Sequence, residues 1–170
     1  LVLYVALYTP LKRHTPHALA IGAIPGAAPP LMGWTAATGS VDGPGLVLFM
    51  VLFLWQMPHF LAIALFRKED YARAGMKTVP IVRGDHVARV QALAYATALL
   101  PMSLALLPLH VAGWSYLIIA TIAGAGFWWI ALQGLRGEVD ARWSRKLFGA
   151  SLLYLPVLVM GLVVDRLAPF

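Results

Sequence analysis

Long apolar runs alternate with short polar segments along most of this chain. Five runs without a charged residue cover residues 18–38, 45–66, 90–109, 111–134 and 147–164. Each is close to the ~20 residues that an α-helix needs to cross ~30 Å of hydrocarbon. The pattern therefore predicts an all-α, polytopic membrane helix bundle with five full transmembrane helices.

A sixth apolar run, residues 1–8, is too short to span a membrane, and the chain does not begin with Met. This run is typical of the last turns of a helix that starts further upstream. We therefore expect residues 1–170 to form a single transmembrane domain that is truncated at its N-terminus.

The basic residues alternate with the apolar runs. Twelve of the thirteen Lys and Arg residues fall in segments 9–17, 67–89 and 135–146, and only Arg166 lies elsewhere. Loops rich in Lys and Arg stay on the cytoplasmic side of a membrane. We therefore expect these segments to face the cytoplasm and the C-terminus to lie outside. The short loops favour a bacterial plasma membrane over a mitochondrial inner membrane.

Composition supports the membrane assignment. The chain is 61% hydrophobic and 12% charged, with a mean hydropathy of +0.78, whereas about a quarter of residues are charged in soluble domains. A net charge of +6 is compatible with nucleic-acid binding. However, no basic face with interleaved aromatic residues accompanies it, so nucleic acid is not an expected partner.

The loop that follows the second full helix concentrates both signs of charge. It includes the segment RKEDYARAGMKTVP, and three of the seven acidic residues fall among six Lys and Arg residues within 67–89. One interpretation is topological anchoring, with Asp70 neutralised by Arg67 or Arg73. The other is a functional site, because long loops in compact folds are often functional and topology needs only basic residues.

The helix that leads into this loop carries Trp55, Gln56 and His59 in an apolar context. His59 lies about 10 Å below the loop, and Trp55 and Gln56 share its face at i−4 and i−3. If the helix continues, Asp70 returns to nearly the same face about 16 Å above. An ionisable residue at this depth normally faces a cavity or a partner. The alternative is a histidine that is hydrogen-bonded between helices.

The segment before and within residues 18–38 has its own features. Lys12 and Arg13 precede it and offer positive charge to an anionic head group, or else set topology. Pro25, Pro29 and Pro30 predict an irregular helix. Gly22 and Gly26 form a small-xxx-small pair that allows close helix contact.

Three blocks resemble a known family in order and spacing: YTPLKRHTPHALAIGAIPGAAPPLMGW, LWQMPHFLAIALFRKEDYARAG and VPIVRG. They are similar to the protohaem IX farnesyltransferases (haem O synthases) of the UbiA superfamily of intramembrane prenyltransferases. The resemblance implies a nine-helix fold, of which this chain would be the end of the fourth helix through the ninth. It covers essentially the whole chain.

The resemblance also implies a reaction, in which the farnesyl group of farnesyl diphosphate is transferred to a vinyl group of protohaem (haem B). Mg²⁺ would be bound by Asp70 and by an aspartate motif absent from this chain, so the chain alone is expected to be inactive. Haem A synthase and the lipid bilayer are further expected partners. The implied site residues are Asp70 and Tyr71 for catalysis, Lys12, Arg13, Arg67, Arg73, Lys77 and Arg83 for diphosphate, and Trp55, Gln56 and His59 for the haem acceptor.

The chain departs from the family pattern in two places. Many relatives have a second aspartate four residues after the first, in the pattern Asp-x-x-x-Asp, whereas here Ala74 stands four residues after Asp70. Lys77 and Thr78 stand where many family members have Pro-Met.

Two other functions remain open. One is a UbiA-type prenyltransferase for a quinone or chlorophyll precursor. The other is a transporter, which the absence of a paired inverted repeat makes less attractive.

Overall fold

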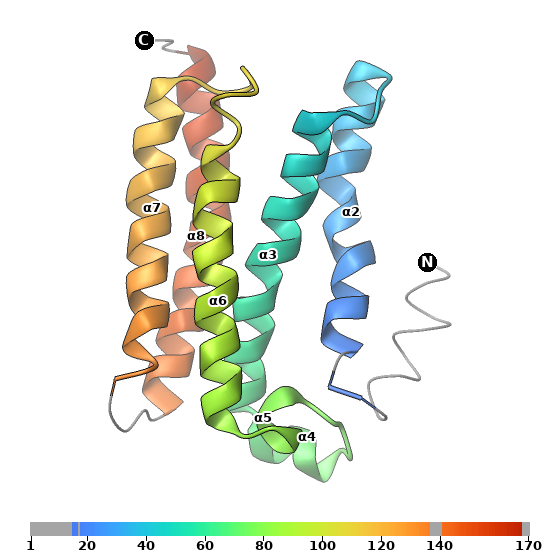
Figure 1. The fold of residues 1–170 in the computed structure, drawn as a ribbon, viewed down its shortest axis with the longest axis vertical. Helices are drawn as coiled ribbons and strands as arrows, with labels where there is room; N and C mark the ends of the chain where they lie inside the picture. The colour runs from blue at the N-terminus through green and yellow to red at the C-terminus, as the bar shows by residue number, and fades with distance from the viewer. Residues whose placement is uncertain (1–14, 17, 137–140, 168–170) are drawn as a thin grey trace.

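Five long helices pack side by side, and two short helices cross one end of the bundle (Figure 1). The computed structural model describes residues 15–16, 18–136 and 141–167, and these contain no strand. The long helices are α2 (Ala18–Thr38), α3 (Gly43–Phe66), α6 (Asp85–Leu104), α7 (Trp114–Gln133) and α8 (Ala141–Leu167). The short ones are α4 (Lys68–Arg73) and α5 (Val79–Val82). The predicted all-α membrane bundle is confirmed.

Four of the described helices, α3, α6, α7 and α8, are long and apolar enough to cross a membrane. The fifth, α2, has 21 residues and no charge, but it contains prolines, glycines and threonines in place of larger apolar residues. Five spanning helices were predicted. Four of them meet the criteria of length and hydropathy, and the fifth, α2, is present as a long helix. The predicted helix end at 1–8 lies outside the described residues.

The central helix of the bundle is α3, which packs against α2, α6 and α8. Helix α7 packs against α6 and α8, whereas α2 lies at the edge beside α3 (Figure 1). Residues on different sides of α3 therefore meet different partners. This arrangement decides where each polar side chain of α3 is directed.

Small residues let α6 approach its neighbours closely. Ala88, Ala92 and Ala96 recur every four residues and are at most 2% exposed. Such a stripe allows helix backbones to come together, which favours packing inside a membrane where the hydrophobic effect between helices is weak. It fixes α6 against the centre of the bundle.

Several helix ends differ from the sequence prediction. Helix α3 begins two residues early because Asp42 caps it, accepting a hydrogen bond from the Gly45 amide at 3.2 Å. Its end at Phe66 agrees with the prediction, and Arg67, with a φ of −109°, leaves the helix. The condition under which Asp70 would return to the face of His59, a continuous helix, is therefore not met. Helix α6 is shifted from 90–109 to Asp85–Leu104, so its first turn includes charged residues.

Helix α2 is more regular than predicted. It runs as one α-helix from Ala18 to Thr38 through Pro25, Pro29 and Pro30. A Cβ atom at Gly26 would lie 2.6 Å from Oε1 of Gln56 on α3, so the Gln56 side chain occupies the space beside this glycine. The predicted close contact through the Gly22 and Gly26 pair stays a prediction.

Buried polar groups connect α6, α7 and α8 toward the opposite end of the bundle. The Tyr116 hydroxyl donates to the Ser103 carbonyl at 3.0 Å, and the hydroxyls of Ser103 and Tyr154 are 2.8 Å apart. Asp165, near the end of α8, accepts hydrogen bonds from the amides of Gly113 (2.6 Å) and Tyr116 (3.3 Å) at the start of α7. These bonds satisfy polar groups that would be costly to leave unpaired inside the bundle.

Candidate functional site

The charged loop after α3 folds back across the end of the bundle. Gly75 follows α4 with a φ of +69°, and Gly84 precedes α6 with a φ of +86°. Only glycine adopts this left-handed region without steric cost, so these two positions allow the sharp changes of direction. The loop thereby lies at the same end as the start of α2 (Figure 1).

Asp70 is paired with two arginines on the exposed side of α4. Its carboxylate oxygens lie 2.5 Å from Nη2 of Arg73 and 3.1 Å from Nη1 of Arg67, and its side chain is 46% exposed. Hydrogen bonds from Arg73 first, and then from Arg67, lower the pKa of the Asp70 carboxyl below its usual range. The sequence analysis considered an ion pair of Asp70 with either Arg67 or Arg73, and the structure shows ion pairs with both.

Another cation of the loop also has a partner. Lys68 donates to the carboxylate of Asp85 at 2.8 Å. By contrast, Lys77 makes no ion pair or hydrogen bond with any residue that the structure describes. An exposed ammonium group without a partner is free to bind an anion.

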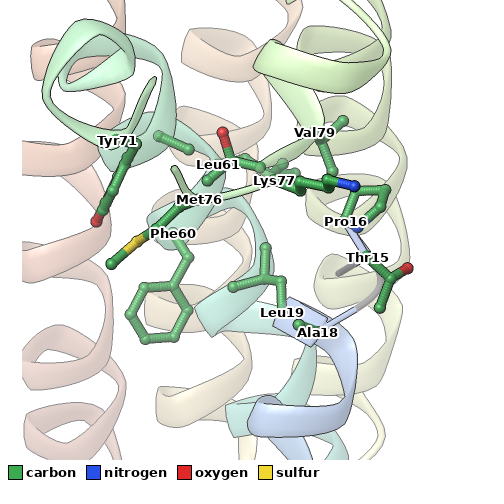
Figure 2. A pocket seen from close by; sticks show the side chains of 12 residues that line it. Thr15, Pro16, Ala18, Leu19, Phe60, Leu61, Tyr71, Met76, Lys77 and Val79 are labelled. Atoms are coloured by element: carbon green, nitrogen blue, oxygen red, sulfur yellow. The ribbon is translucent and has the colours of Figure 1, made fainter. Parts of the chain in front are cut away.

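Lys77 lines a cavity of about 220 Å³ at this end of the bundle, which we call the mouth pocket (Figure 2). Its walls come from the start of α2, the last turns of α3 and the loop, namely Thr15, Pro16, Ala18, Leu19, Phe60, Leu61, Ala64, Tyr71, Met76, Lys77, Thr78 and Val79. In the view of Figure 2, Tyr71 and Met76 lie on one side and Lys77 extends toward Pro16 on the other.

The mouth pocket is polar in one part and apolar in another. Tyr71, Lys77 and Thr78 come from the loop, whereas Leu19 and Phe60 come from the membrane helices. The buried hydroxyl of Thr78 has no hydrogen-bond partner among the described residues. An ammonium group at the edge of a cavity with an apolar wall matches an amphiphile with an anionic head.

Helix α4 separates the predicted catalytic pair. Tyr71 lines the mouth pocket, whereas Asp70 and Arg67 line a separate cavity of about 340 Å³ that also includes Ala141. Arg83 lines a smaller cavity of about 50 Å³ that shares Leu19 with the mouth pocket. Lys12 and Arg13, the other predicted diphosphate ligands, lie outside the described residues.

Trp55 and His59 are directed from α3 to α8. The Trp55 indole donates to the Ser151 carbonyl at 2.7 Å, and Nδ1 of His59 lies 2.8 Å from the Ser151 hydroxyl. The His59 ring stacks on Trp55 with centroids 5.0 Å apart and packs against Phe148 at 4.9 Å. The interhelical hydrogen bond that the sequence left as an alternative for His59 is therefore present.

Gln56 faces a different neighbour. Its side chain is buried and donates to the Ala23 carbonyl of α2 at 2.9 Å. The predicted common face of Gln56 and His59 is therefore not formed. Residues three apart on a helix are about 60° apart around its axis, and α3 lies between α2 and α8, so this angle is enough to direct them to opposite partners.

The described residues do not fit a Mg²⁺ site as they stand. Among residues 15–16, 18–136 and 141–167, no group of three or more His, Cys, Asp or Glu side chains comes together. Mg²⁺ requires near-octahedral oxygen ligands. Both oxygens of Asp70 already bind arginines, so this carboxylate serves here as an anion for Arg67 and Arg73.

The sequence analysis missed Ser151, Phe148 and Thr78. Ser151 lies in the apolar segment GASLLYL of α8, where a single serine is unremarkable until α8 is known to face His59. Thr78 was noted only as a departure from a family pattern. No local signal distinguishes these residues, because their importance depends on which helices are neighbours.

Comparisons with known proteins agree with the architecture. The model of the UbiA prenyltransferase family matches residues 1–153. Similar proteins include "protoheme IX farnesyltransferase" of Sorangium cellulosum, 49% identical over 164 residues, and that of Myxococcus xanthus, 48% identical over 166 residues. The corresponding protein of Anaeromyxobacter sp. strain Fw109-5 is 49% identical over 162 residues.

These matches cover 96%, 98% and 95% of this chain, and 59%, 56% and 54% of the three relatives. The chain therefore spans little more than half the length of the curated relatives that it matches. No solved structure matches it. The family match sets aside the transporter alternative.

Proposed function

Because this chain belongs to the UbiA prenyltransferase family, we propose that it forms part of an enzyme that transfers the farnesyl group of farnesyl diphosphate to a vinyl group of protohaem. The names of the relatives support this acceptor and this prenyl group. The product would be haem O, which a haem A synthase would accept as its substrate.

The observation that carries the proposal is the mouth pocket. Lys77, Tyr71 and Thr78 are its polar lining residues, and Phe60 and Leu61 belong to its apolar wall. We assign the diphosphate to the polar part and the start of the prenyl chain to the apolar wall. Charged groups in a site with little water interact more strongly than in bulk solvent, which suits a reaction that creates charge.

The reaction begins with cleavage of the bond between the first prenyl carbon and the diphosphate oxygen. The leaving diphosphate takes the electron pair, and Lys77 would neutralise the charge that develops on it. The allylic cation that remains would be stabilised by the nearby ring of Phe60. The vinyl carbon of protohaem then attacks the cation, and water adds to the new cation and loses a proton, which gives the hydroxyethylfarnesyl group.

Arg67, Arg73 and Arg83 are proposed as further counter-charges for the diphosphate, and Trp55 and His59 as the acceptor side of the site. Mg²⁺ dependence also stays a prediction. Since Asp70 is occupied by two arginines and no carboxylate cluster forms among the described residues, no step above depends on the metal.

The membrane location of the site follows from the same arrangement. We propose that the end of the bundle with α4 and α5 faces the cytoplasm of a bacterium, where farnesyl diphosphate is soluble. Proximity of the polar loop to water would let the diphosphate enter and leave, while the prenyl chain stays among the helices.

The experiment that tests this function measures binding of farnesyl diphosphate to the full-length protein in nanodiscs. Lys77→Met should weaken binding by about tenfold to a hundredfold, because a hydrogen bond to a charged group contributes about 1.5–3 kcal/mol. The matched control is Lys146→Met, at the same end of the bundle, whose ammonium contacts Gln133 at 3.3 Å. Equal affinities of the wild-type protein and Lys77→Met would contradict the assignment of the diphosphate.

A further inference from the structure

We propose that Ser151 of α8 is a positioning residue that holds His59 in one tautomer, with Nε2 free to ligate the iron of the protohaem substrate. The inference rests on the proposed function for the identity of the haem. It adds a residue from another helix and a defined atom of His59 to the acceptor side of the site.

The hydrogen-bond directions follow from the number of protons available. The Ser151 hydroxyl donates to the Phe148 carbonyl at 2.6 Å, and a carbonyl oxygen can only accept. A hydroxyl has one proton, so the Ser151 oxygen must accept in its contact of 2.8 Å with Nδ1 of His59. Nδ1 therefore carries the proton, and in the neutral ring Nε2 carries the free lone pair.

The surrounding side chains keep this ring in place. Ser151 is fully buried, and its carbonyl also accepts a hydrogen bond from the Trp55 indole at 2.7 Å. The His59 ring lies between Trp55 and Phe148, with centroids 5.0 Å and 4.9 Å away. A single residue of α8 therefore orients both the imidazole and the aromatic ring stacked on it.

This arrangement is the one that metal-binding histidines use. Such a histidine usually donates its other N–H to an oxygen acceptor, which fixes the tautomer and raises the basicity of the ligating nitrogen. Here the acceptor is the Ser151 hydroxyl, itself bonded to a carbonyl. An imidazole is a common axial ligand of haem iron, and an ionisable intramembrane residue such as the half-buried His59 normally has a functional partner.

Ligation by Nε2 would place the acceptor beside the prenyl donor. Phe60, which follows His59 on α3, lines the mouth pocket, and its ring packs edge-on against His59 with centroids 5.3 Å apart. A macrocycle held at His59 would therefore lie next to the apolar wall assigned to the prenyl chain. Ligation of the iron by His59 would fix the position of the vinyl group along the membrane normal relative to the allylic carbon of the prenyl donor.

The test uses full-length protein in nanodiscs, titrated with protohaem in the absence of farnesyl diphosphate. Resonance Raman spectra of the ferrous complex should show an iron–imidazole stretch in the wild-type protein and none in His59→Ala. Ser151→Ala should weaken haem binding by about tenfold to a hundredfold, as loss of an outer partner does in other metal sites, and shift the band. Ser151→Thr, which keeps the hydroxyl, should restore both.

The matched control is Ser144→Ala. Ser144 is buried in the same helix and its hydroxyl donates to the Ala141 carbonyl at 3.0 Å, so this variant should leave the band unchanged. A second measurement is independent of how Ser151→Ala folds. Nitrogen NMR of ¹⁵N-histidine-labelled wild-type protein, with the His59 signals assigned from His59→Ala, should show a protonated Nδ1 and an unprotonated Nε2.

Three results would count against the inference. A protonated Nε2 in the haem-free protein would overturn the tautomer, and haem binding without an iron–imidazole band would overturn the ligation. An unchanged band and affinity in a folded Ser151→Ala variant would overturn the role of Ser151. All three leave the proposed function standing, whereas failure of the wild-type protein to bind protohaem would overturn that function and the ligation with it.

Discussion

Single side chains at the loop end of the bundle differ in whether they already have a charged partner. Arg67 and Arg73 share Asp70, and Lys68 binds Asp85. Lys77, by contrast, lines the mouth pocket without a partner among the described residues. The charges of the loop therefore differ in role: three of its six basic residues form ion pairs that order α4 and the start of α6, whereas Lys77 is available for an anionic ligand.

Asp70 is the carboxylate predicted to act in the transfer. If Asp70 shares Mg²⁺ with the aspartate motif that the family resemblance implies, Asp70→Asn should lower kcat by about a hundredfold or more and affinity for farnesyl diphosphate less, because the metal would neutralise charge on the leaving diphosphate. Turnover measured against Mg²⁺ concentration checks this. Glu69→Gln, which removes the adjacent carboxylate, is the control. Near-normal turnover with an unchanged Mg²⁺ requirement would show that Asp70 only anchors the loop.

The same variant also has a pH signature. Arg73 and Arg67 lower the pKa of Asp70 in the folded protein from the ordinary value of 3.8. The stabilising effect of the ion pairs is therefore fully present above that value and is lost as the pH falls through the lower folded pKa. The thermal stability of the wild-type protein and of Asp70→Asn should accordingly differ at neutral pH and converge in acid.

The sequence analysis identified candidate site residues, but it did not predict which of them lie together in one cavity. Asp70 and Tyr71 are adjacent in the chain, yet α4 directs them to different cavities. The apolar run predicts the end of α3 at Phe66, but no residue signals the separate short helix α4 that directs the two side chains apart. Ser151 was missed because a serine in an apolar helix has no distinctive pattern until its neighbour is known.

At the scale of helices, the hydropathy pattern predicted the elements better than their ends. The prediction for α2 was correct at both ends. Helix α8 begins at Ala141 instead of residue 147, so it includes Arg142, Arg145 and Lys146. An apolar run reflects the thickness of the hydrocarbon, but a helix continues into the interface wherever its backbone bonds and caps allow.

The cap that Asp165 provides joins two helices and can be tested by stability. Its carboxylate accepts hydrogen bonds from the Gly113 and Tyr116 amides, where an anion also interacts favourably with the N-terminal dipole of α7. Asp165→Ala should lower the free energy of unfolding by about 1–3 kcal/mol, measured by thermal melting in detergent. Asp165→Asn, which keeps an acceptor oxygen, should lose less. Equal stability of all three proteins would contradict the role of the cap.

At the scale of the whole molecule, the described basic segments lie at one end of the bundle. The loop with α4 and α5, the end of α7 and the start of α8 are together at that end, whereas the turns after α2 and α6 lie at the other (Figure 1). Large apolar side chains such as Ile122 and Leu153 are 70% and 69% exposed. In a lipid bilayer these side chains would contact acyl chains, so the outer surface suits the membrane.

This arrangement predicts which loops face which side. A cysteine introduced at Lys77 should be labelled by an impermeant reagent only from the cytoplasmic side, and one at Ser40 only from the outside, because basic loops remain inside. Residues 1–170 contain no cysteine, and the same protein without the introduced cysteine is the control for background labelling. Labelling of both positions from the same side would contradict the proposed orientation.

The central claim is that this chain belongs to an enzyme that farnesylates haem at a site formed by the loop and the membrane helices. The most direct measurement supplies full-length protein in nanodiscs with protohaem and farnesyl diphosphate and follows the porphyrin products by mass spectrometry. We expect haem O, carrying one farnesyl group and one added water, to form with the wild-type protein and much more slowly with Lys77→Met. Unmodified protohaem, together with prenylation of an aromatic quinone precursor offered in its place, would contradict the account.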